Sequence, residues 1–361
     1  MAVAGGASDD RIRVAIVGFG RVGRAVLELA QTRPWLEVVA LFARRPQRSG
    51  EPASVTVPTA PADLAVRVDA EAALAGVRPD MVVVATRSRL TDVLPQLRAA
   101  ADSGARAVVC TAEELAYVQP GDSPEAAAIH ELAERHSVAV VASGVNPGFV
   151  LDLWPLALSA LAWDVERLEA RRIGDVSVFA PHTRTQLGIG HDEPSFRAGV
   201  AAGTIAGHLG FRESLRLLSA AMGRPAERIT IDTEPVLAER DYVLSDGLIP
   251  AGRTVAASQK AVAWWQGDAW ISVEMLLHVA PEQDAIRPID EAHLYGRHEL
   301  HATIDPGSAA VIGAAAHLVN IIPTALEAAP GLYRPGTLPL AAPWLAASRP
   351  MATTRTSPVR A

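Results

Sequence analysis

Two adjacent carboxylates in the first half of the chain have the residue type and position for acid–base chemistry. Residues 105–110 form a short apolar run that predicts a buried strand, and Glu113 and Glu114 follow it by three and four residues. The carboxyl end of a parallel strand is where ligands of open α/β sheets collect. In a partly dry pocket, a carboxylate at that edge can take up a proton or stabilise a developing positive charge.

The same glutamates also have a structural explanation. Thr111 and Glu114 have the spacing of a capping box, in which the threonine caps a helix and the glutamate reaches back to it. Under that hypothesis the cap occupies Glu114, which favours Glu113 as the acting group. Both glutamates are candidate catalytic residues, and the sequence leaves open which of them acts.

A glycine-rich turn near the N-terminus predicts the ligand that these carboxylates would meet. Residues 11–17 predict a strand, the pattern G-x-G-x-x-G follows at residues 18–23, and a helical apolar pattern continues from residue 25. Such a turn binds a dinucleotide, because its glycines allow a tight turn, a close approach of the pyrophosphate and close helix packing. The predicted cofactor contacts of the turn are Gly18, Phe19, Gly20, Arg21, Val22 and Gly23.

The end of the second predicted strand, residues 36–42, indicates which dinucleotide binds. An NAD-selective site usually places an acidic residue about 20 positions beyond the glycines, where it binds the ribose 2′-hydroxyl. This chain has Ala43, Arg44 and Arg45 there. Two guanidinium groups suit a 2′-phosphate, so we expect NADP(H), with NAD(H) as the alternative cofactor. A solvated basic loop that continues to Arg48 is the competing explanation.

Polar residues follow two further predicted strands. Thr86, Arg87 and Ser88 come at the end of the strand predicted at residues 80–86, where their hydroxyls can contact the cofactor or cap the next helix. Asn146 follows the strand predicted at residues 138–142. Its side chain has donors and acceptors that suit a carboxamide or a bound carbonyl, although an Asn-Pro turn explains it structurally.

The order of the predicted elements gives an α/β fold with two domains. Strands and helices alternate up to residue 148, which predicts an N-terminal Rossmann domain built on a doubly wound parallel sheet. Residues 149–307 carry long alternating strands, which predict a C-terminal α+β domain on a mostly antiparallel sheet; we expect strands at 166–179, 228–237, 254–265, 270–279 and 291–304. An apolar helix at about 308–328 is expected to pack back on the first domain, leaving 329–361 as an extended tail.

Composition excludes several classes of partner. The formal net charge is −7 and there is no polybasic run, so we expect neither nucleic acid nor a membrane surface as a partner. Cys110 is the only cysteine, and Met1–Asp10 has neither the basic nor the apolar segment of a signal peptide, which favours a cytoplasmic protein. The three histidines between 293 and 301 lack metal-site spacing, so we expect no metal.

Several motifs, in matching order over nearly the whole chain, resemble those of 2,4-diaminopentanoate dehydrogenases and the related native amine dehydrogenases, which are distantly similar to dihydrodipicolinate reductases. The motifs are Gly18-x-Gly20-x-x-Gly23, Thr111-Ala112-Glu113-Glu114-Leu115, Gly144-Val145-Asn146-Pro147-Gly148-Phe149 with Asp152, Gly207-His208-Leu209-Gly210 with Glu213-Ser214, Glu234-Pro235, and His317-Leu318-Val319-Asn320-Ile321-Ile322-Pro323 with Pro330-Gly331-Leu332. Where the family is expected to carry a Gly-Asp pair, this chain has Asp305-Pro306-Gly307-Ser308.

The resemblance implies a homodimer that uses NAD(P) to interconvert an amine with a carbonyl compound and ammonia. It carries the family's catalytic glutamate over to Glu113 or Glu114, as the base and the group that stabilises an iminium. An apolar substrate also needs a pocket that excludes water. The candidate pocket residues are Phe149, Leu151, Trp154, Phe179, His182 and His208.

Two other functions fit the same fold. One is an NADPH-dependent carbonyl or dihydrodipicolinate-type reductase that uses no ammonia, and the other is a non-catalytic NADPH-binding sensor. A carbonyl reductase usually needs a proton donor such as tyrosine, and the only tyrosine of the first half is Tyr117. A sensor would bind NADPH without turnover.

Overall fold

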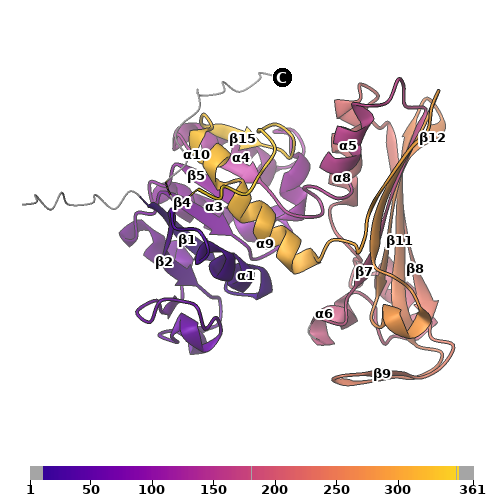
Figure 1. The fold of residues 1–361 in the computed structure, drawn as a ribbon, viewed down its shortest axis with the longest axis horizontal. Helices are drawn as coiled ribbons and strands as arrows, with labels where there is room; N and C mark the ends of the chain where they lie inside the picture. Colours follow the sequence, from indigo (N-terminus) through magenta and orange to yellow (C-terminus); the bar gives the residue numbers. More distant parts are fainter. Residues whose placement is uncertain (1–10, 180, 347, 349–361) are drawn as a thin grey trace, which may run out of the picture. The chain divides into compact units, whose positions relative to one another are not determined.

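The chain divides into two compact units (Figure 1). The computed structural model describes residues 11–346 except 180, and residue 348. Unit 1 takes the chain up to Val145 and again from Val311, and unit 2 is Asn146–Ala310. The N-terminal tail predicted at residues 1–10 and the end of the predicted C-terminal tail, 349–361, lie outside the described residues.

Unit 1 is built on a seven-stranded parallel sheet in the order β15-β6-β5-β4-β1-β2-β3. Its strands are β1 (Ile12–Val17), β2 (Leu36–Phe42), β3 (Val66–Arg67), β4 (Met81–Val84), β5 (Ala107–Cys110), β6 (Ala139–Ala142) and β15 (Gly331–Tyr333). Without β15, this is the strand order of doubly wound dinucleotide-binding sheets, in which ligands bind where the order reverses, between β1 and β4. The Rossmann-type fold class is therefore confirmed.

Helices cover both faces of this sheet. They are α1 (Arg21–Ala30), α2 (Ala70–Ala73), α3 (Leu90–Asp102), α4 (Pro124–Arg135), α9 (Ala310–Asn320) and α10 (Ile322–Glu327), with 3-10 turns η1 (Pro46–Arg48), η2 (Ala53–Val55), η3 (Leu74–Gly76) and η4 (Glu113–Tyr117). Successive strand residues alternate between two cores: Ile16 packs with residues of α1, α9 and α10, whereas Val17 packs with residues of α3 and α4. Because both faces are buried, the central strands β4, β5 and β6 are apolar throughout.

The last helical stretch belongs to the core of unit 1. Among the described residues, Ala310–Glu327 is the one helical stretch long and apolar enough to cross a membrane by length and composition alone. Leu318, Val319 and Ile322 are buried in the core beside α1, whereas Ile312 is 69% exposed and 33% of the stretch is buried. The helix predicted at 308–328 is in fact two helices, because Pro323 has no N–H to donate to a carbonyl of the preceding turn.

The chain after α10 contributes a strand that the sequence analysis assigned to the tail. Gly331–Tyr333 forms β15, which pairs in parallel with β6 at the edge of the sheet. Tyr333 is buried, and the next residue, Arg334, places its guanidinium 4.7 Å from the ring centre of Tyr117 in η4. A three-residue strand between prolines is too short to give a periodic signal.

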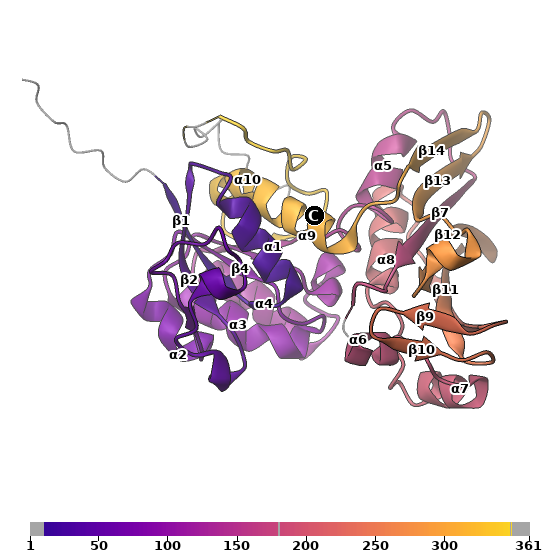
Figure 2. The ribbon, with the colours of Figure 1, turned by 60° about the horizontal axis from the view of Figure 1, so that its bottom comes forward.

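Unit 2 is built on a six-stranded sheet in the order β14-β13-β7-β12-β11-β8 (Figure 2). Its strands are β7 (Arg167–Asp175), β8 (Arg228–Leu237), β11 (Thr254–Trp265), β12 (Asp268–His278), β13 (Ile289–Tyr295) and β14 (Leu300–Ile304). Only β7 and β12 pair in parallel, which confirms the mostly antiparallel sheet. The strand predicted at 291–304 is a hairpin of β13 and β14.

Helices pack on one face of the unit 2 sheet. The elements outside the sheet are α5 (Leu153–Ser159), α6 (Pro181–Gln186), α7 (Glu193–Ala201), α8 (Phe211–Ala221), the turn η5 (Pro281–Asp284) and a separate hairpin of β9 (Tyr242–Leu244) and β10 (Gly247–Ile249). Helix α8 packs on β11 and β12, and α5 packs on α8 and β13. The opposite face carries ion pairs, including Arg171 with Glu274 at 3.9 Å and with Glu291 at 3.6 Å.

The carboxylate of Asp152 fixes the start of α5. One oxygen accepts from the N–H of Leu153 at 2.7 Å, and the other accepts from the N–H of Gly148 at 2.9 Å and from the hydroxyl of Ser214 in α8 at 2.8 Å. Burial raises the pKa of this carboxyl group, whereas the three hydrogen bonds act in the opposite direction. Asp152 therefore joins the turn around Gly148 to two helices.

We expect Asp152→Ala to lower the free energy of unfolding by about 2–4 kcal/mol, because it leaves buried donors unpaired. Ser214→Ala removes one of these donors and should cost about 1 kcal/mol. Urea unfolding followed by circular dichroism measures both changes. The exposed Asp268 in the β11–β12 turn provides the control, for which alanine should change stability by less than about 0.5 kcal/mol. A loss at Asp152 no larger than the loss at Asp268 would refute this role.

Candidate functional site

The glycine-rich turn between β1 and α1 has the geometry that its pattern predicts. Gly18 has a φ of +105°, and a Cβ there would lie 2.3 Å from the carbonyl oxygen of Ala85. A Cβ on Gly23 would lie 1.8 Å from the carbonyl oxygen of Gly18. The N–H groups of Gly18 and Phe19 both donate to the carbonyl of Phe42 at the end of β2. The turn is therefore held between three strands, and only glycine fits at two of its positions.

Gly20 lies on the open side of this turn. A Cβ on it would meet no atom within 4 Å, and as the N-cap of α1 it offers no side-chain hydrogen bond to the helix. The first turn of α1 has no acidic residue. Open space beside uncapped backbone N–H groups is the arrangement that binds a phosphate. The described residues thus fit a dinucleotide, whose pyrophosphate Gly20, Arg21 and Val22 would hold.

Phe19 is a core residue, and Arg48 holds it in place. The ring of Phe19 is buried, and the guanidinium carbon of Arg48 lies 4.9 Å from its centre. Arg48 also donates to the carbonyl of Phe19 at 3.1 Å and makes two bonds to Glu51, at 2.7 and 2.8 Å. This pair holds the pKa of the Glu51 carboxyl at about 2. Arg48 is therefore a structural residue and not part of a solvated basic loop, which stays the competing explanation for Arg44 and Arg45.

Arg44 and Arg45 have a different environment. Both are exposed just beyond the end of β2, the strand next to β1 in the sheet. Neither guanidinium has a hydrogen-bond or ion-pair partner within the described part of the chain. Both charges are thus available to an anionic ligand, in contrast to the charge of Arg48.

Thr86, Arg87 and Ser88 follow β4 next to the glycine-rich turn. A Cβ on Gly18 would lie 2.8 Å from the methyl group of Thr86, and the Thr86 hydroxyl donates to the side-chain carbonyl of Gln96 at 2.6 Å. The carbonyl of Ser88 accepts from the N–H of Glu114 at 3.1 Å. The N-cap of α3 is Arg89, and no side chain of Thr86 or Ser88 caps this helix. The capping alternative for these hydroxyls is wrong.

The capping box predicted at Thr111 and Glu114 is also wrong. Glu113–Tyr117 forms the 3-10 turn η4, whose N-cap is Ala112, and the hydroxyl of Thr111 lies 3.5 Å from the carbonyl of Val84 instead of capping this turn. Glu114 instead accepts from the N–H of Leu90 at 2.9 Å and lies 3.6 Å from Arg89. Its carboxylate caps α3, a helix 24 residues earlier in the chain. A carboxylate fits there because the positive end of a helix dipole attracts it.

The two glutamates lie at the carboxyl ends of β4 and β5. Glu113 is half-buried, and its charge contributes to raising the pKa of the buried Cys110 thiol to about 12, for which burial is the main cause. Cys110 is therefore a buried apolar residue, as its sequence context predicts, and not a thiolate nucleophile. Within unit 1, the structure joins Thr86, Ser88 and Glu114 to the glycine-rich turn through β4 and the loop after it.

His317 of α9 meets the end of β6. Its Nδ1 lies 2.9 Å from the hydroxyl of Ser143, and one helical turn earlier Gly313 brings α9 close to Val145, whose methyl group a Cβ would meet at 3.1 Å. Burial lowers the pKa of His317 to about 4. Helix α9 therefore fixes the segment that leads to Asn146. In the sequence, His317 stands out only as part of a family motif.

Asn146 and His208 lie together in unit 2. The Nδ2 of Asn146 is 2.8 Å from the Nε2 of His208. The N–H of His208 donates to the side-chain carbonyl of Gln259 in β11 at 2.8 Å. Desolvation, with the charge of Arg172 as the second cause, lowers the pKa of His208 to about 4. Two residues predicted for different roles are thus hydrogen-bonded partners, and Gln259 is a positioning residue that the sequence analysis missed.

The remaining predicted pocket residues have different surroundings. Phe149 and Trp154 are half-buried and joined by the bond from the N–H of Trp154 to the carbonyl of Phe149, and Leu151 between them is fully buried. Phe179 packs against a core around Tyr242 in the β9–β10 hairpin. His182 is exposed in α6, and its ring contacts the hydroxyl of the neighbouring Thr183 at 3.3 Å. The structure thus brings together the three residues around α5 but associates Phe179 with another core.

A buried ion pair close to His208 was also missed. Arg172 of β7 and Asp290 of β13 lie 3.6 Å apart, and both are almost wholly buried. Arg172 donates to the hydroxyl and carbonyl of Ser308, whereas Asp290 accepts from the N–H and hydroxyl of Ser308. The turn at 305–308, where the chain departs from the expected Gly-Asp pair, is therefore anchored on the sheet.

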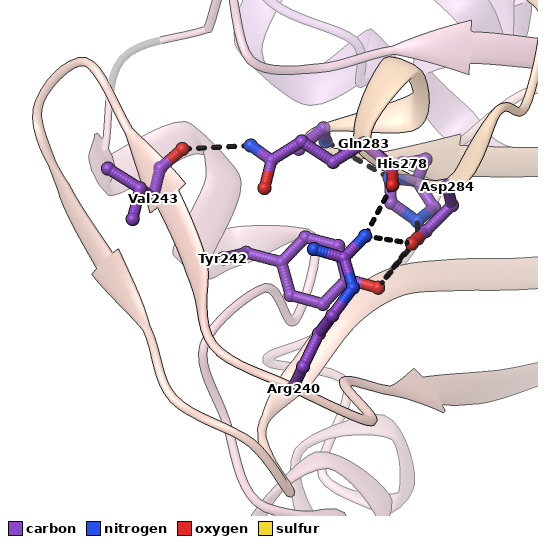
Figure 3. Close-up of polar contacts among 7 residues, drawn as sticks. Arg240, Tyr242, Val243, His278, Gln283 and Asp284 are labelled. Atoms are coloured by element: carbon purple, nitrogen blue, oxygen red, sulfur yellow. Dashed lines mark hydrogen bonds and ion pairs between the residues drawn. The ribbon is translucent and has the colours of Figure 1, made fainter.

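A histidine–carboxylate cluster ties η5 to the β9–β10 hairpin. Figure 3 shows Asp284 accepting from the hydroxyl of Tyr242 at 2.7 Å, from Arg240 at 2.8 Å and from the Nε2 of His278 at 3.0 Å. The Nδ1 of His278 accepts from the N–H of Ala280 at 3.0 Å. Both ring nitrogens are therefore engaged, so this cluster holds structure together and leaves no nitrogen for a substrate. Among the residues described, no group of three or more metal-binding side chains is arranged to hold an ion.

Two glycine substitutions should separate the two roles of the glycine-rich turn. Gly20→Ala has room for its methyl group, so we expect the melting temperature to stay within about 2 °C while dinucleotide affinity falls at least about tenfold, because the methyl occupies the side that phosphates approach. Gly23→Ala forces a methyl group into the Gly18 carbonyl and should destabilise unit 1 by several kcal/mol. Thermal unfolding and calorimetric titration with NADPH measure both. Equal stability of the two variants would contradict the packing described here.

His208 and His317 should make stability depend on pH. Their folded pKa values are about 4, whereas an unfolded histidine has a pKa of about 6.5. Below pH 6.5 the unfolded state binds more protons, so the free energy of unfolding should fall with pH by up to about 1.4 kcal/mol per unit for each histidine. Urea unfolding between pH 6.5 and 5 measures this slope. His317→Asn should make it shallower, and an unchanged slope would mean that His317 is protonated in the folded protein.

Comparison with known proteins agrees with this architecture. Residues 12–144 match the model of the dihydrodipicolinate reductase N-terminus, and residues 149–354 match that of the 2,4-diaminopentanoate dehydrogenase C-terminal domain. A 2,4-diaminopentanoate dehydrogenase of Acetoanaerobium sticklandii is 26% identical over 92% of this chain and 94% of its own length. An amine dehydrogenase of Streptomyces virginiae is 25% identical over 91% and 96%, respectively.

A solved structure gives the same fold. The amine dehydrogenase from Mycobacterium smegmatis superimposes with a TM-score of 0.82 at 23% sequence identity, covering 92% of this chain and 98% of that one. The resemblance inferred from the motifs is therefore confirmed. Because the C-terminal domain model spans more than half of the sequence, this chain belongs to the 2,4-diaminopentanoate dehydrogenase family.

Proposed function

We propose that this protein is an amine dehydrogenase that interconverts an amine with a carbonyl compound and ammonia, using a nicotinamide cofactor. The observation that carries the proposal is the pair Glu113 and Glu114 at the carboxyl ends of β4 and β5, next to the switch point where a dinucleotide binds. Membership of the 2,4-diaminopentanoate dehydrogenase family, and relatives named as dehydrogenases of diaminopentanoate and of amines, support it.

Reductive amination gives a carboxylate two tasks. It takes a proton from ammonium, and the free ammonia then adds to the carbonyl carbon to give a carbinolamine. The carboxyl group returns that proton to the carbinolamine hydroxyl, which leaves as water, so the iminium cation forms beside a carboxylate whose negative charge stabilises it. The bound nicotinamide supplies the hydride that reduces the iminium carbon to the amine. Because Glu114 caps α3, we assign the proton transfer to Glu113, with Glu114 holding η4 against α3.

The cofactor we propose is NADP(H). Arg44 and Arg45 are exposed at the end of β2, and their guanidinium groups have the shape and charge to grip a 2′-phosphate. The Arg48–Glu51 pair sets the path of the loop behind them. Thr86, Arg87 and Ser88 complete the proposed cofactor contacts.

The substrate pocket and the assembly are further proposals. We propose that the half-buried Phe149 and Trp154, which flank the buried Leu151, line with His208 a pocket for a substrate with a hydrocarbon body. Phe179, which packs against the core around Tyr242, and the exposed His182 remain candidates. We also propose a homodimer, from the family resemblance, and a cytoplasmic location, from the single buried cysteine and the composition.

Glu113→Gln should lower the kcat of ammonia-dependent NADPH oxidation by about 10²–10⁴-fold, the usual cost of a lost general base. Stability and NADPH affinity should stay near those of the wild type, because the change keeps the shape of the side chain. Glu114→Gln weakens the cap of α3 and should lower the free energy of unfolding by about 1 kcal/mol. Initial rates over a panel of carbonyl compounds, with thermal unfolding of the same samples, measure both.

The two glutamine variants are controls for each other, because they remove the same charge from neighbouring positions. Near-normal ammonia-dependent turnover in both would eliminate the carboxylate mechanism. If only Glu114→Gln is inactive, the mechanism holds and the roles of the two glutamates are exchanged.

Replacing Arg44 and Arg45 together by alanine should raise the Kd for NADPH by at least about tenfold and leave the Kd for NADH within about twofold, because only NADPH carries the 2′-phosphate. Gln47→Ala, in the same exposed loop, is the matched control and should change neither value. Calorimetric titration of each variant with both cofactors gives the four constants. A parallel loss for NADH and NADPH would show that the arginines do not read the phosphate.

A further inference from the structure

The side-chain amide of Asn146 has one end occupied and the other end open to a ligand. Its Nδ2 is engaged with the Nε2 of His208 at 2.8 Å. Its Oδ1 is buried and has no hydrogen-bond partner among the described residues. Asn146 as a whole is 8% exposed. A buried acceptor without a donor costs about 1–3 kcal/mol, so a partner that supplies a donor should bind there with that gain.

The position of His208 explains why the amide is turned this way. Gly207, with a φ of +61°, lies against the Gln259 side chain, where a Cβ would come within 2.9 Å of the amide atoms. The side-chain carbonyl of Gln259 accepts from the backbone N–H of His208. Gln259 therefore fixes the backbone that carries the His208 ring. Desolvation and the nearby charge of Arg172 keep the ring neutral. A neutral ring that accepts at Nε2 carries its proton on Nδ1.

This arrangement limits what Asn146 can recognise. A free asparagine offers a donor and an acceptor, and on sequence grounds it suits either a carboxamide or a carbonyl group. Here His208 takes the donor, so only the acceptor remains. An acceptor attracts an N–H group, whereas it repels a carbonyl oxygen.

We infer that Asn146, oriented by His208, is a specificity-determining residue that accepts a hydrogen bond from a nitrogen-bearing group of the bound ligand. This inference rests on the proposed function, in which two ligands carry such a group: the carboxamide of nicotinamide, and the nitrogen of the amine or iminium. Both meet Oδ1 through an N–H. The experiment separates them.

The cofactor arm compares NADP⁺ with its 3-acetylpyridine analogue, in which a methyl ketone replaces the carboxamide and removes the N–H donor. If Oδ1 binds the carboxamide, the wild type should bind NADP⁺ about five- to tenfold more tightly than the analogue, the usual worth of one neutral hydrogen bond. Asn146→Ala should abolish that preference. Calorimetric titration measures it without turnover.

The amine arm measures the KM for ammonium during reductive amination. If Oδ1 binds the nitrogen of the reacting amine, Asn146→Ala should raise this KM about 10- to 100-fold, since a hydrogen bond to a charged group is stronger than a neutral one. The preference for NADP⁺ over the analogue should then stay as in the wild type. Gln283→Ala removes an amide from the distant η5 turn, where it bonds to Val243, and should change neither arm.

Asn146→Asp tests the polarity of the contact and guards against a variant that fails to fold. The aspartate keeps an acceptor toward the ligand, and the His208 ring can shift its proton to Nε2 to meet the other oxygen. In the arm that Asn146→Ala changes, the value measured for Asn146→Asp, either the preference for NADP⁺ over the analogue or the KM for ammonium, should therefore stay within about threefold of the wild-type value. If Asn146→Asp is impaired as much as Asn146→Ala, the amide presents its donor instead, and the inference is overturned.

Failure of this inference and failure of the proposed function give different results. A change in either arm with Asn146→Ala, rescued by aspartate, supports the inference and names the ligand. No change in either arm overturns it. If the wild type shows no ammonia-dependent turnover, the proposed function fails, and the cofactor arm alone then decides the inference.

Discussion

The close approach of three backbone segments at Gly18 is the constraint on which unit 1 depends. Its φ of +105° turns the chain sharply at the end of β1, where the loop after β4 leaves no room for a Cβ. Gly23 then lets α1 pack directly against that turn. The open side of the same turn, at Gly20, is consequently formed by backbone alone. The fold and the proposed phosphate site thus rest on different glycines of the same turn, which is why a short pattern near the N-terminus predicts both.

Much of the fold could be predicted because its signals are local. Strands β4, β5 and β6 are short apolar runs buried on both faces, and Gln266 and Gly267, a residue pair typical of a hairpin turn, both adopt positive φ between β11 and β12. Asp69 caps α2, and its position before an alanine-rich run is typical of a helix N-cap. The predicted boundaries of two elements were wrong because a single residue or turn decides them. Pro323 divides the last predicted helix into α9 and α10, and the turn around Gly296 divides a predicted strand into β13 and β14.

The sequence predicted which residues belong to the candidate site better than it predicted the contacts between them. Glu114 was expected to bond within its own turn, yet it caps α3, because the helix start at Leu90 lies next to it only once β4 and β5 have paired. Arg172 and Asp290 stand opposite each other in β7 and β13, a register that the sequence does not contain. The Asn146–His208 bond likewise spans 62 residues. Long-range polar pairs of this kind carry no periodic signal, so only the folded chain shows them.

The central claim is that a hydride reaches the carbon of an iminium formed from ammonia. The most direct test incubates the wild-type protein with a panel of carbonyl compounds, [¹⁵N]ammonium and NADPH deuterated at both C4 positions, and analyses the products by mass spectrometry. The account predicts an amine that carries ¹⁵N and one deuterium on the adjacent carbon. A deuterated alcohol, formed at the same rate with and without ammonium, would show a carbonyl reductase and contradict it.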